Sequence, residues 1–360
     1  MKIRIASLVL LFIFAFSFLS FAEELKITEV QISTSAINGG QIYCGTDNWS
    51  TKSGVCNRGT EYTLEAKSDK AIFLYWQDNT TGKIISKEKI LTILVLDNVD
   101  IKAVFVPNST MANVSYTTFF DYNGNVLQAG YNNKIPPSTS NLESAGYNYS
   151  GWTPSDYLAQ QIGSIYTVTP NLTKKDQHFN VSVAGGFAVP AQENYEYDTF
   201  VTVVADESAV PSGKHFKGWS VNGSFASYDK TFSLLVGCNS NITAVYSDTE
   251  PVKDNVVAII DGSRTIVNGA ISFLSYRNAI EGCTVLDSGI LYASSTFAES
   301  LTLDSVGVLK GKAQSKTSSG MYRLNVKAYA GDSIKACAYM IYKYNDKLYV
   351  IYSDTITVKK

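Results

Sequence analysis

Histidine is almost absent from this sequence: His178 and His215 are the only two among 360 residues, and they stand in different segments. A metal site made of several histidines, or a histidine-based proton relay, needs such residues within one domain. The Gly-x-Ser-x-Gly and His-Glu-x-x-His motifs do not occur either. The sequence therefore predicts no metal, no cofactor and no enzymatic activity.

Charge is also scarce. Charged residues make up 17% of the chain, and the formal net charge of −2 is spread along it. Nucleic-acid binding needs a clustered basic face, so we expect no nucleic-acid partner. The segment Gly307 to Lys312 resembles a phosphate-binding loop, but it has one residue too few between its glycines and Ala313 where Ser or Thr should follow. It predicts a lysine-bearing turn.

A long apolar run occurs only once, from Ile5 to Phe21. Lys2 and Arg4 precede this run, and a small-x-small pattern ends at Ala22, which together predict a secretory signal peptide over residues 1–22. The run is also at the lower edge of spanning length, so an uncleaved N-terminal anchor is the alternative. With cleavage, we expect an extracellular or cell-surface protein with no membrane span.

The five cysteines all follow the predicted signal peptide, in the part of the chain where disulfides are permitted. Cys44 and Cys56 flank a loop rich in Gly, Ser, Thr and Asn and form the stronger candidate pair. Cys283 and Cys337, near the C-terminus, form a weaker one. Cys238 is left over, and we interpret it as a small apolar residue beside a strand end.

A repeat is present in the first two thirds of the chain. The segments 59–66, 73–76 and 98–105 return as 198–205, 216–219 and 240–246, with the same spacing inside each leading segment. Tryptophans recur once per copy, at Trp76, Trp152 and Trp219. Each copy alternates apolar and polar residues between Asn, Asp and Gly turns, as β-strands do.

The repeat and a linker at residues 248–253 divide the chain. After the signal peptide we expect a first module (23–107), a degenerate second module (108–176), a third module (177–249) and a C-terminal module (250–360) with six or seven strands, typical of a β-sandwich. The predicted fold class is all-β, with tandem small repeat modules followed by a sandwich of the immunoglobulin or fibronectin-III type.

Within the second module, three local features are expected. Asn123-Gly124 predicts a hairpin turn. Ser155 to Gln161, which follows Pro154, could form one or two helical turns. Pro170 follows Tyr166-Thr167-Val168 where the other copies have their closing Ala-Val-aromatic strand, so that strand is expected to be missing.

The pattern Gly-x-x-Tyr-Thr-Leu-x-Ala, Phe-x-x-Trp and Asn-x-x-Ile-x-Ala-Val-Phe around residues 59–105 resembles the divergent internalin-type B repeat of bacterial surface proteins. The segments ending at Trp152 and Trp219 look like further members. The C-terminal module is similar to the fibronectin-type-III-like modules of exported bacterial proteins. This resemblance implies compact β modules with a role in display, spacing or adhesion at the cell envelope.

The leading hypothesis is thus a secreted or surface-associated adhesion or spacer protein that binds a protein or envelope partner without catalysis. The alternative is a glycan-binding module that uses the aromatic residues Tyr147, Tyr149 and Tyr157, because exposed aromatic side chains bind such partners well. An enzyme with a dispersed carboxylate pair is the third hypothesis. The three tryptophans of the repeat are interpreted as structural anchors of small cores.

Overall fold

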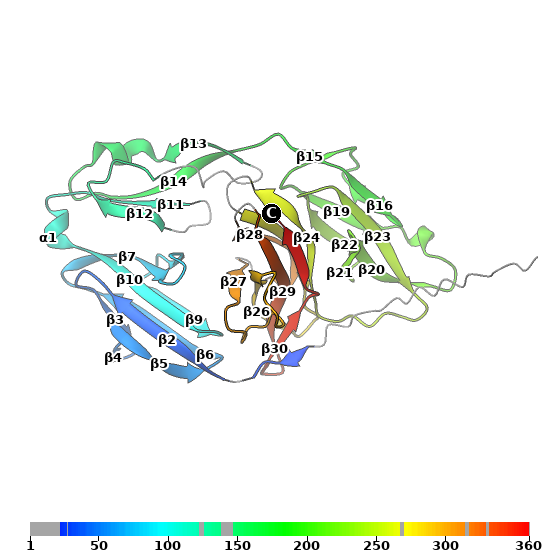
Figure 1. Cartoon of the computed structure of the whole chain (residues 1–360), viewed down its shortest axis with the longest axis horizontal. Helices are drawn as coiled ribbons and strands as arrows, with labels where there is room; N and C mark the ends of the chain where they lie inside the picture. The colour runs from blue at the N-terminus through cyan, green and yellow to red at the C-terminus, as the bar shows by residue number, and fades with distance from the viewer. Residues whose placement is uncertain are drawn as a thin grey trace, which may run out of the picture.

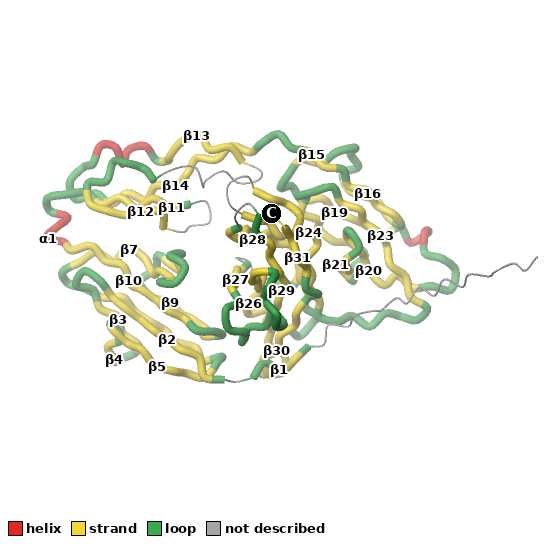
Figure 2. Tube along the Cα trace, in the orientation of Figure 1, coloured by secondary structure: helices red, strands yellow, loops and turns green. Residues whose placement is uncertain are grey.

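The computed structural model describes residues 22–26, 28–121, 126–137, 147–266, 270–313, 317–328 and 331–359. The Asn123-Gly124 turn and the predicted signal peptide, apart from Ala22, lie outside the described residues. Strands dominate throughout, and the few helical turns are short (Figure 2). No helix in the described part of the chain is long and apolar enough to cross a membrane.

The first module is a sandwich of two sheets with the strand orders β5-β2-β10-β7-β8 and β4-β3-β6-β9. Its strands are β2 (Glu29–Ala36), β3 (Gln41–Cys44), β4 (Asp47–Asn48), β5 (Thr51–Asn57), β6 (Thr60–Lys67), β7 (Ala71–Asp78), β8 (Ile84–Ser86), β9 (Ile90–Val95) and β10 (Val99–Pro107). On β6, Leu64 and Ala66 point into the core between the sheets while Glu61 is exposed, which is the alternation that the sequence predicts.

The third module repeats this arrangement, with sheets β16-β23-β20-β21 and β17-β19-β22. Its elements are β15 (His178–Phe179), β16 (Val181–Ala184), β17 (Gly186–Val189), β18 (Tyr195–Glu196), β19 (Phe200–Ala205), η2 (Glu207–Ala209), β20 (His215–Val221), β21 (Ser224–Ser227), β22 (Thr231–Leu235) and β23 (Ser240–Ser247). Trp219 lies opposite Ala244 as Trp76 lies opposite Ala103, so the two copies agree in register.

The second module has one sheet among the described residues, with the order β12-β11-β14-β13. Its elements are α1 (Asn108–Met111), β11 (Tyr116–Phe120), β12 (Val126–Tyr131), β13 (Tyr147–Thr153), the 3₁₀ helix η1 (Ser155–Ala159) and β14 (Ile165–Lys174). The expectation of a missing closing strand is wrong, because β14 is that strand, and Pro170 replaces alanine opposite Trp152. Proline is tolerated there because β11 pairs with β14 only as far as Val168.

The C-terminal module is a sandwich of the sheet β24-β25-β28 and the sheet β1-β30-β29-β26-β27, with β31 also paired to β29. Its own strands are β24 (Val256–Ile266), β25 (Ala270–Asn278), β26 (Thr284–Ser294), β27 (Leu309–Lys312), β28 (Ser319–Lys327), β29 (Ser333–Tyr344), β30 (Lys347–Tyr352) and β31 (Ile356–Lys359). The segment 307–312 that predicted a turn therefore ends in a strand.

One strand of this sheet comes from the other end of the chain. β1 (Glu23–Glu24) pairs antiparallel with β30, so that Glu23 lies opposite Val350. The next residue, Leu25, is 5% exposed and packs among apolar side chains of the C-terminal module. Residues 23–25, which the sequence assigned to the first module, thus complete the C-terminal one.

Both outer faces of the C-terminal sandwich are covered by repeat modules, and Figure 1 shows it between the blue strands of the first module and the green strands of the third. On one face, Leu94 and Leu96 of the first module join a cluster with Tyr339 and Ile341. On the other face, the core of the third module continues into Ile260, Tyr276 and Met321. The four modules therefore form one packed body.

The two repeat modules use the same end for this docking. Leu94 lies opposite Glu61, and Leu235 lies opposite Phe200, which is the equivalent position in the later copy. Leu94 packs on the C-terminal module, and the backbone N–H of Leu235 lies 2.9 Å from Sδ of Met321 in that module. An ion pair flanks each contact, Arg58 with Asp304 and Arg323 with Asp198.

Trp219→Ala should destabilise the third module by about 3 to 5 kcal/mol, because the indole is fully buried against Phe216 and Phe232. Trp219→Phe should cost much less, since the buried indole Nε1 makes no hydrogen bond among the described residues. Trp152→Ala is the matched control and should cost less, because Trp152 is partly exposed. Urea denaturation measures all three, and equal losses for both alanine variants would contradict the anchor interpretation.

Leu96→Asp should separate the first module from the C-terminal module. Leu96 is 6% exposed in their shared apolar cluster, and an unpaired carboxylate there costs several kcal/mol. Ile90→Asp is the matched control, since Ile90 lies near the other end of β9 and is 59% exposed. Small-angle X-ray scattering should show a larger radius of gyration for Leu96→Asp alone. An unchanged radius with an unchanged melting temperature would mean that this contact does not hold the modules together.

Candidate functional site

The aromatic residues predicted to bind a ligand lie in the second module, on β13 and η1. The side chain of Tyr147 is outside the described part of the structure. Tyr149 is half-buried, and its ring lies 5.8 Å from that of Trp152. Burial, and secondarily the neighbouring Tyr157, raises the pKa of Tyr149. One side of the predicted cluster is therefore accessible to a ligand.

Tyr157 is a core residue, which corrects the prediction that it binds a ligand. It is 5% exposed, and its ring makes an edge-on contact with Phe119 at 5.2 Å. Phe119 makes a similar contact with Trp152, also at 5.2 Å. In the other two copies a second sheet covers the conserved tryptophan position, whereas here η1 delivers Tyr157 to that side. A residue that fills this volume is not available for binding.

The cysteines are free thiols in the structure. Cys337 belongs to the apolar cluster that faces the first module, whereas Cys283 packs against the core inside the sandwich. The two side chains therefore lie on opposite faces of the sheet that contains β29. This placement corrects the predicted Cys283–Cys337 pair. Cys44 and Cys56 both border the core of the first module, where burial and the two nearby thiols raise the pKa of Tyr62. Their pairing stays a prediction.

The two histidines lie on different strands, His178 on β15 and His215 on β20. His178 contacts Asp176 at 3.1 Å, and His215 contacts Glu250 at 2.7 Å, both in exposed pairs. Within the described ranges, His, Cys, Asp and Glu side chains nowhere gather in threes in a way that suits a metal ion. The Cys238 thiol lies near Asn222 and Ser240, not near His215 among its described contacts.

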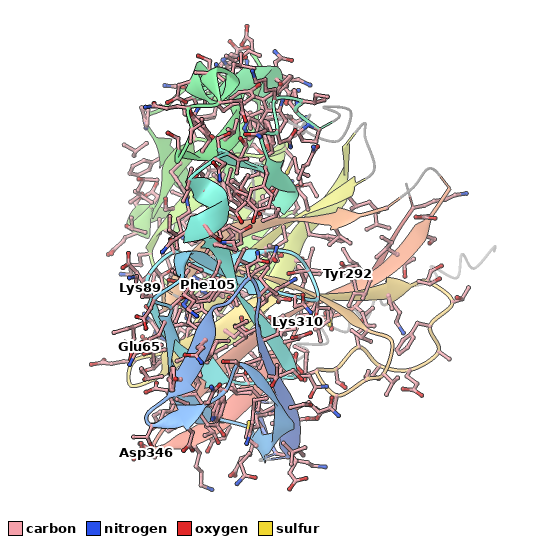
Figure 3. The ribbon with its side chains drawn as sticks, turned by 90° about the vertical axis from the view of Figure 1, so that its left-hand side faces the viewer. Glu65, Lys89, Phe105, Tyr292, Lys310 and Asp346 are labelled. Atoms are coloured by element: carbon pink, nitrogen blue, oxygen red, sulfur yellow. The ribbon has the colours of Figure 1, made fainter. Side chains whose placement is uncertain are left out.

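A cleft of 390 Å³ lies where the first module meets the C-terminal module. One wall comes from the start of β2, Arg58 and the turn before β10. The other comes from Leu291 on β26, the loop between β26 and β27, and Lys310. The lining residues are Thr28, Glu29, Val30, Arg58, Asp97, Asn98, Leu291, Thr302, Leu303, Asp304, Ser305, Val306, Gly307, Val308 and Lys310. Figure 3 shows Lys310 at the edge of the blue and cyan strands of the first module.

Ion pairs across the two modules form part of the cleft walls. Arg58, with a side chain only 2% exposed, bonds to Asp304, whose side chain is 57% exposed. Lys310, 13% exposed, lies 2.9 Å from Asp97 and 3.5 Å from the buried Asp287, and its ammonium lies 5.2 Å from the ring centre of Tyr339. In the two pairs that join the modules, Arg58 with Asp304 and Lys310 with Asp97, the cation is therefore more deeply buried than its carboxylate partner.

Sequence reasoning missed this cleft. Lys310 belongs to the segment that we dismissed as a phosphate loop, and Arg58 lies just before the repeat signature. The partner residues Arg58 and Asp304 are 246 positions apart. Local patterns carry no information on such a pair.

With this geometry established, the third module can be compared with known families. Residues 179–250 match the model of the divergent InlB B-repeat domain. The third module is therefore similar to this repeat domain. The first module shares the register of this repeat domain around its tryptophan, and the single sheet of the second keeps the strand that carries the tryptophan and the closing strand.

Two solved structures resemble the chain only weakly. A DUF3823 family protein from Bacteroides ovatus matches with 12% identity and a TM-score of 0.22, over 51% of this chain and 93% of that one. The FN1–FN3 domains of chicken CNTN1 match with 8% identity and a TM-score of 0.16, over 84% of this chain and 96% of that one. These scores are too low to assign a fold. No curated protein matches the chain.

The first and second modules contact each other through the buried phenol of Tyr75. Burial, followed by the effect of Tyr116, raises the pKa of Tyr75 to about 12, although a hydrogen bond with Thr118 of the second module opposes this rise. The Tyr75 ring also packs edge-on against Phe120, at 6.2 Å. The neutral phenol is thus part of the contact between the first and second modules.

Stability should fall as the pH rises above about 10, the ordinary pKa of tyrosine. Unfolded Tyr75 loses its proton there, while the folded protein keeps it until about pH 12, so the unfolded state binds fewer protons and is favoured by rising pH. Tyr75→Phe should flatten this fall, by up to about 1.4 kcal/mol per pH unit. Tyr131→Phe, which removes a phenol that is 42% exposed, is the control. Urea titrations at pH 8, 10 and 11 measure the slope, and identical slopes for both variants would exclude Tyr75 as a cause.

Proposed function

We propose that this chain is an exported, surface-associated binding protein without catalysis, in which the repeat modules and the C-terminal sandwich form a rigid display body. The observation that carries the proposal is the docking of equivalent ends of two repeats onto opposite faces of one sandwich. The match to a repeat domain of bacterial surface proteins supports the same function. The predicted signal peptide supports export.

The arrangement of the modules favours a protein that displays a binding surface over a protein that serves as a spacer. The N-terminal β1 pairs with β30, so the start of the described chain folds back onto the C-terminal module instead of running away from it. A spacer would gain reach from modules joined end to end, whereas these modules bury apolar residues such as Leu96 and Leu235 against a common partner. A rigid, preorganised surface also loses less conformational entropy when it binds.

A glycan-binding surface on the second module is the second candidate. One observation favours it: Tyr149 and Trp152 are both partly exposed and make a ring contact at 5.8 Å. Tyr157 is no longer part of this surface. Saturable binding on a glycan array that Tyr149→Ala abolishes would support this candidate, and binding that survives the substitution would exclude it.

The proposed function predicts that the host exports the protein, removes residues 1–22 and keeps the rest at its surface. Intact-mass measurement of the exported protein should give a chain that begins at Glu23. Protease treatment of whole cells should then remove it. A protein found only inside the cell, with its first 22 residues attached, would contradict the proposal.

Retention at the surface provides the sharper test. Purified Leu96→Asp protein, in which the first module is released, should bind less well to cells that lack the gene than wild-type protein does. Ile90→Asp protein should bind normally. Equal surface binding by all three proteins would show that the packed body is not needed for function.

A further inference from the structure

The cleft between the first and C-terminal modules has the features of a binding site, although no sequence motif marks it. Its volume of 390 Å³ lies in the range of small-molecule sites, and such sites are common at domain boundaries. The equivalent end of the third module also docks on the sandwich, with Arg323 bonded to Asp198 and to the hydroxyl of Tyr197. Both docking contacts thus carry a largely buried cation paired with a carboxylate of the facing module.

The charges in the walls argue for a neutral ligand. Arg58 and Lys310 are each paired with a carboxylate from the opposite module, so the cleft offers no free cation for an anionic ligand. A cationic ligand would compete with Arg58 or Lys310 for those carboxylates, and among the described lining residues only the Glu29 carboxylate lies outside an ion pair. A neutral ligand keeps both ion pairs, and therefore keeps the contact between the modules.

The polar groups nearest the solvent argue for hydroxyl groups on that ligand. The carboxylates of Glu29 and Asp304 are exposed, and a carboxylate has about four acceptor positions, more than one ion pair uses. The Asn98 side chain uses its oxygen for the backbone N–H of Gln31, and its amide group can still donate. Hydroxyl groups both donate and accept, so adjacent hydroxyls on one ring can bond to carboxylate and amide together.

Apolar side chains complete the lining. Leu303 and Val308 are partly exposed and border the cleft. These groups suit the C–H face of a sugar ring. No aromatic residue lines the cleft, so the ring gains no aromatic contact, and a dissociation constant on the order of 1 mM is expected.

We propose that this cleft binds a neutral saccharide unit, through Glu29 and Asp304 at its mouth and the side chains of Leu303 and Val308 in its wall. The proposal rests on the proposed function as a binding protein, and it names a site distinct from Tyr149. Saturation-transfer NMR of the full mature chain with maltose, lactose and N,N′-diacetylchitobiose as probes should show transfer to at least one of them. Absence of transfer from all three at 20 mM, roughly twenty times the expected dissociation constant, would overturn the proposal.

Two substitutions locate the site. Glu29→Gln keeps the shape of the side chain and should weaken binding about tenfold, or about 1.4 kcal/mol. Glu88→Gln is the matched control, an exposed glutamate two residues before Ile90 and outside the cleft lining, and should bind normally. Asp304→Asn should also weaken saccharide binding. If small-angle X-ray scattering shows that Asp304→Asn separates the modules, the result with Glu29→Gln alone tests the site.

The remaining outcomes are also decisive. Binding that is lost in Tyr149→Ala but kept in Glu29→Gln would place the sugar on the second module and overturn the cleft proposal. Surface retention of the protein is measured without any sugar. A failure of the cleft proposal therefore leaves the display function standing, and loss of surface retention would count against display alone.

Discussion

The structure depends on a β-sandwich whose two outer faces are both apolar. Along β29, Ala336, Ala338 and Met340 point into the sandwich, while Cys337, Tyr339 and Ile341 point outward and are at most 1% exposed. A sheet that is apolar on both faces needs cover on both. Here the cover comes from the repeat modules, so their docking is a condition for the C-terminal module to exclude water.

The same constraint explains why the repeats could diverge so differently. The first and third modules keep two sheets, because one sheet carries the leucine that docks and the other carries the buried tryptophan. The described residues of the second module contribute to neither apolar cluster on the sandwich. This module packs against the first module through a contact between Tyr75 and Phe120. Tyr157 covers the side of Trp152 that a second sheet covers in the other modules.

Much of the fold could be predicted from the sequence, because each repeat alternates with period two and the alternation fixes which side chains face the core. Trp76 and Trp219 follow from that pattern. Tyr157 and Pro170 do not, since their surroundings depend on the sheet that this copy lacks among the described residues. The cleft depends on Arg58 meeting Asp304 from the far end of the chain, and no local pattern encodes such a contact.

The pairing of β1 with β30 shows how weak local elements become part of a fixed structure. Two residue pairs and an exposed ion pair between Glu24 and Lys347 are a small contribution by themselves. Leu25 adds the larger contribution, because its side chain is buried in the apolar cluster that also contains Tyr339 and Leu96. Arg58 then bonds to the backbone oxygen of Lys26, which directs the chain from β1 into β2. β1 is thus held by the docking contact as well as by its pairing with β30, and opening that contact should release it.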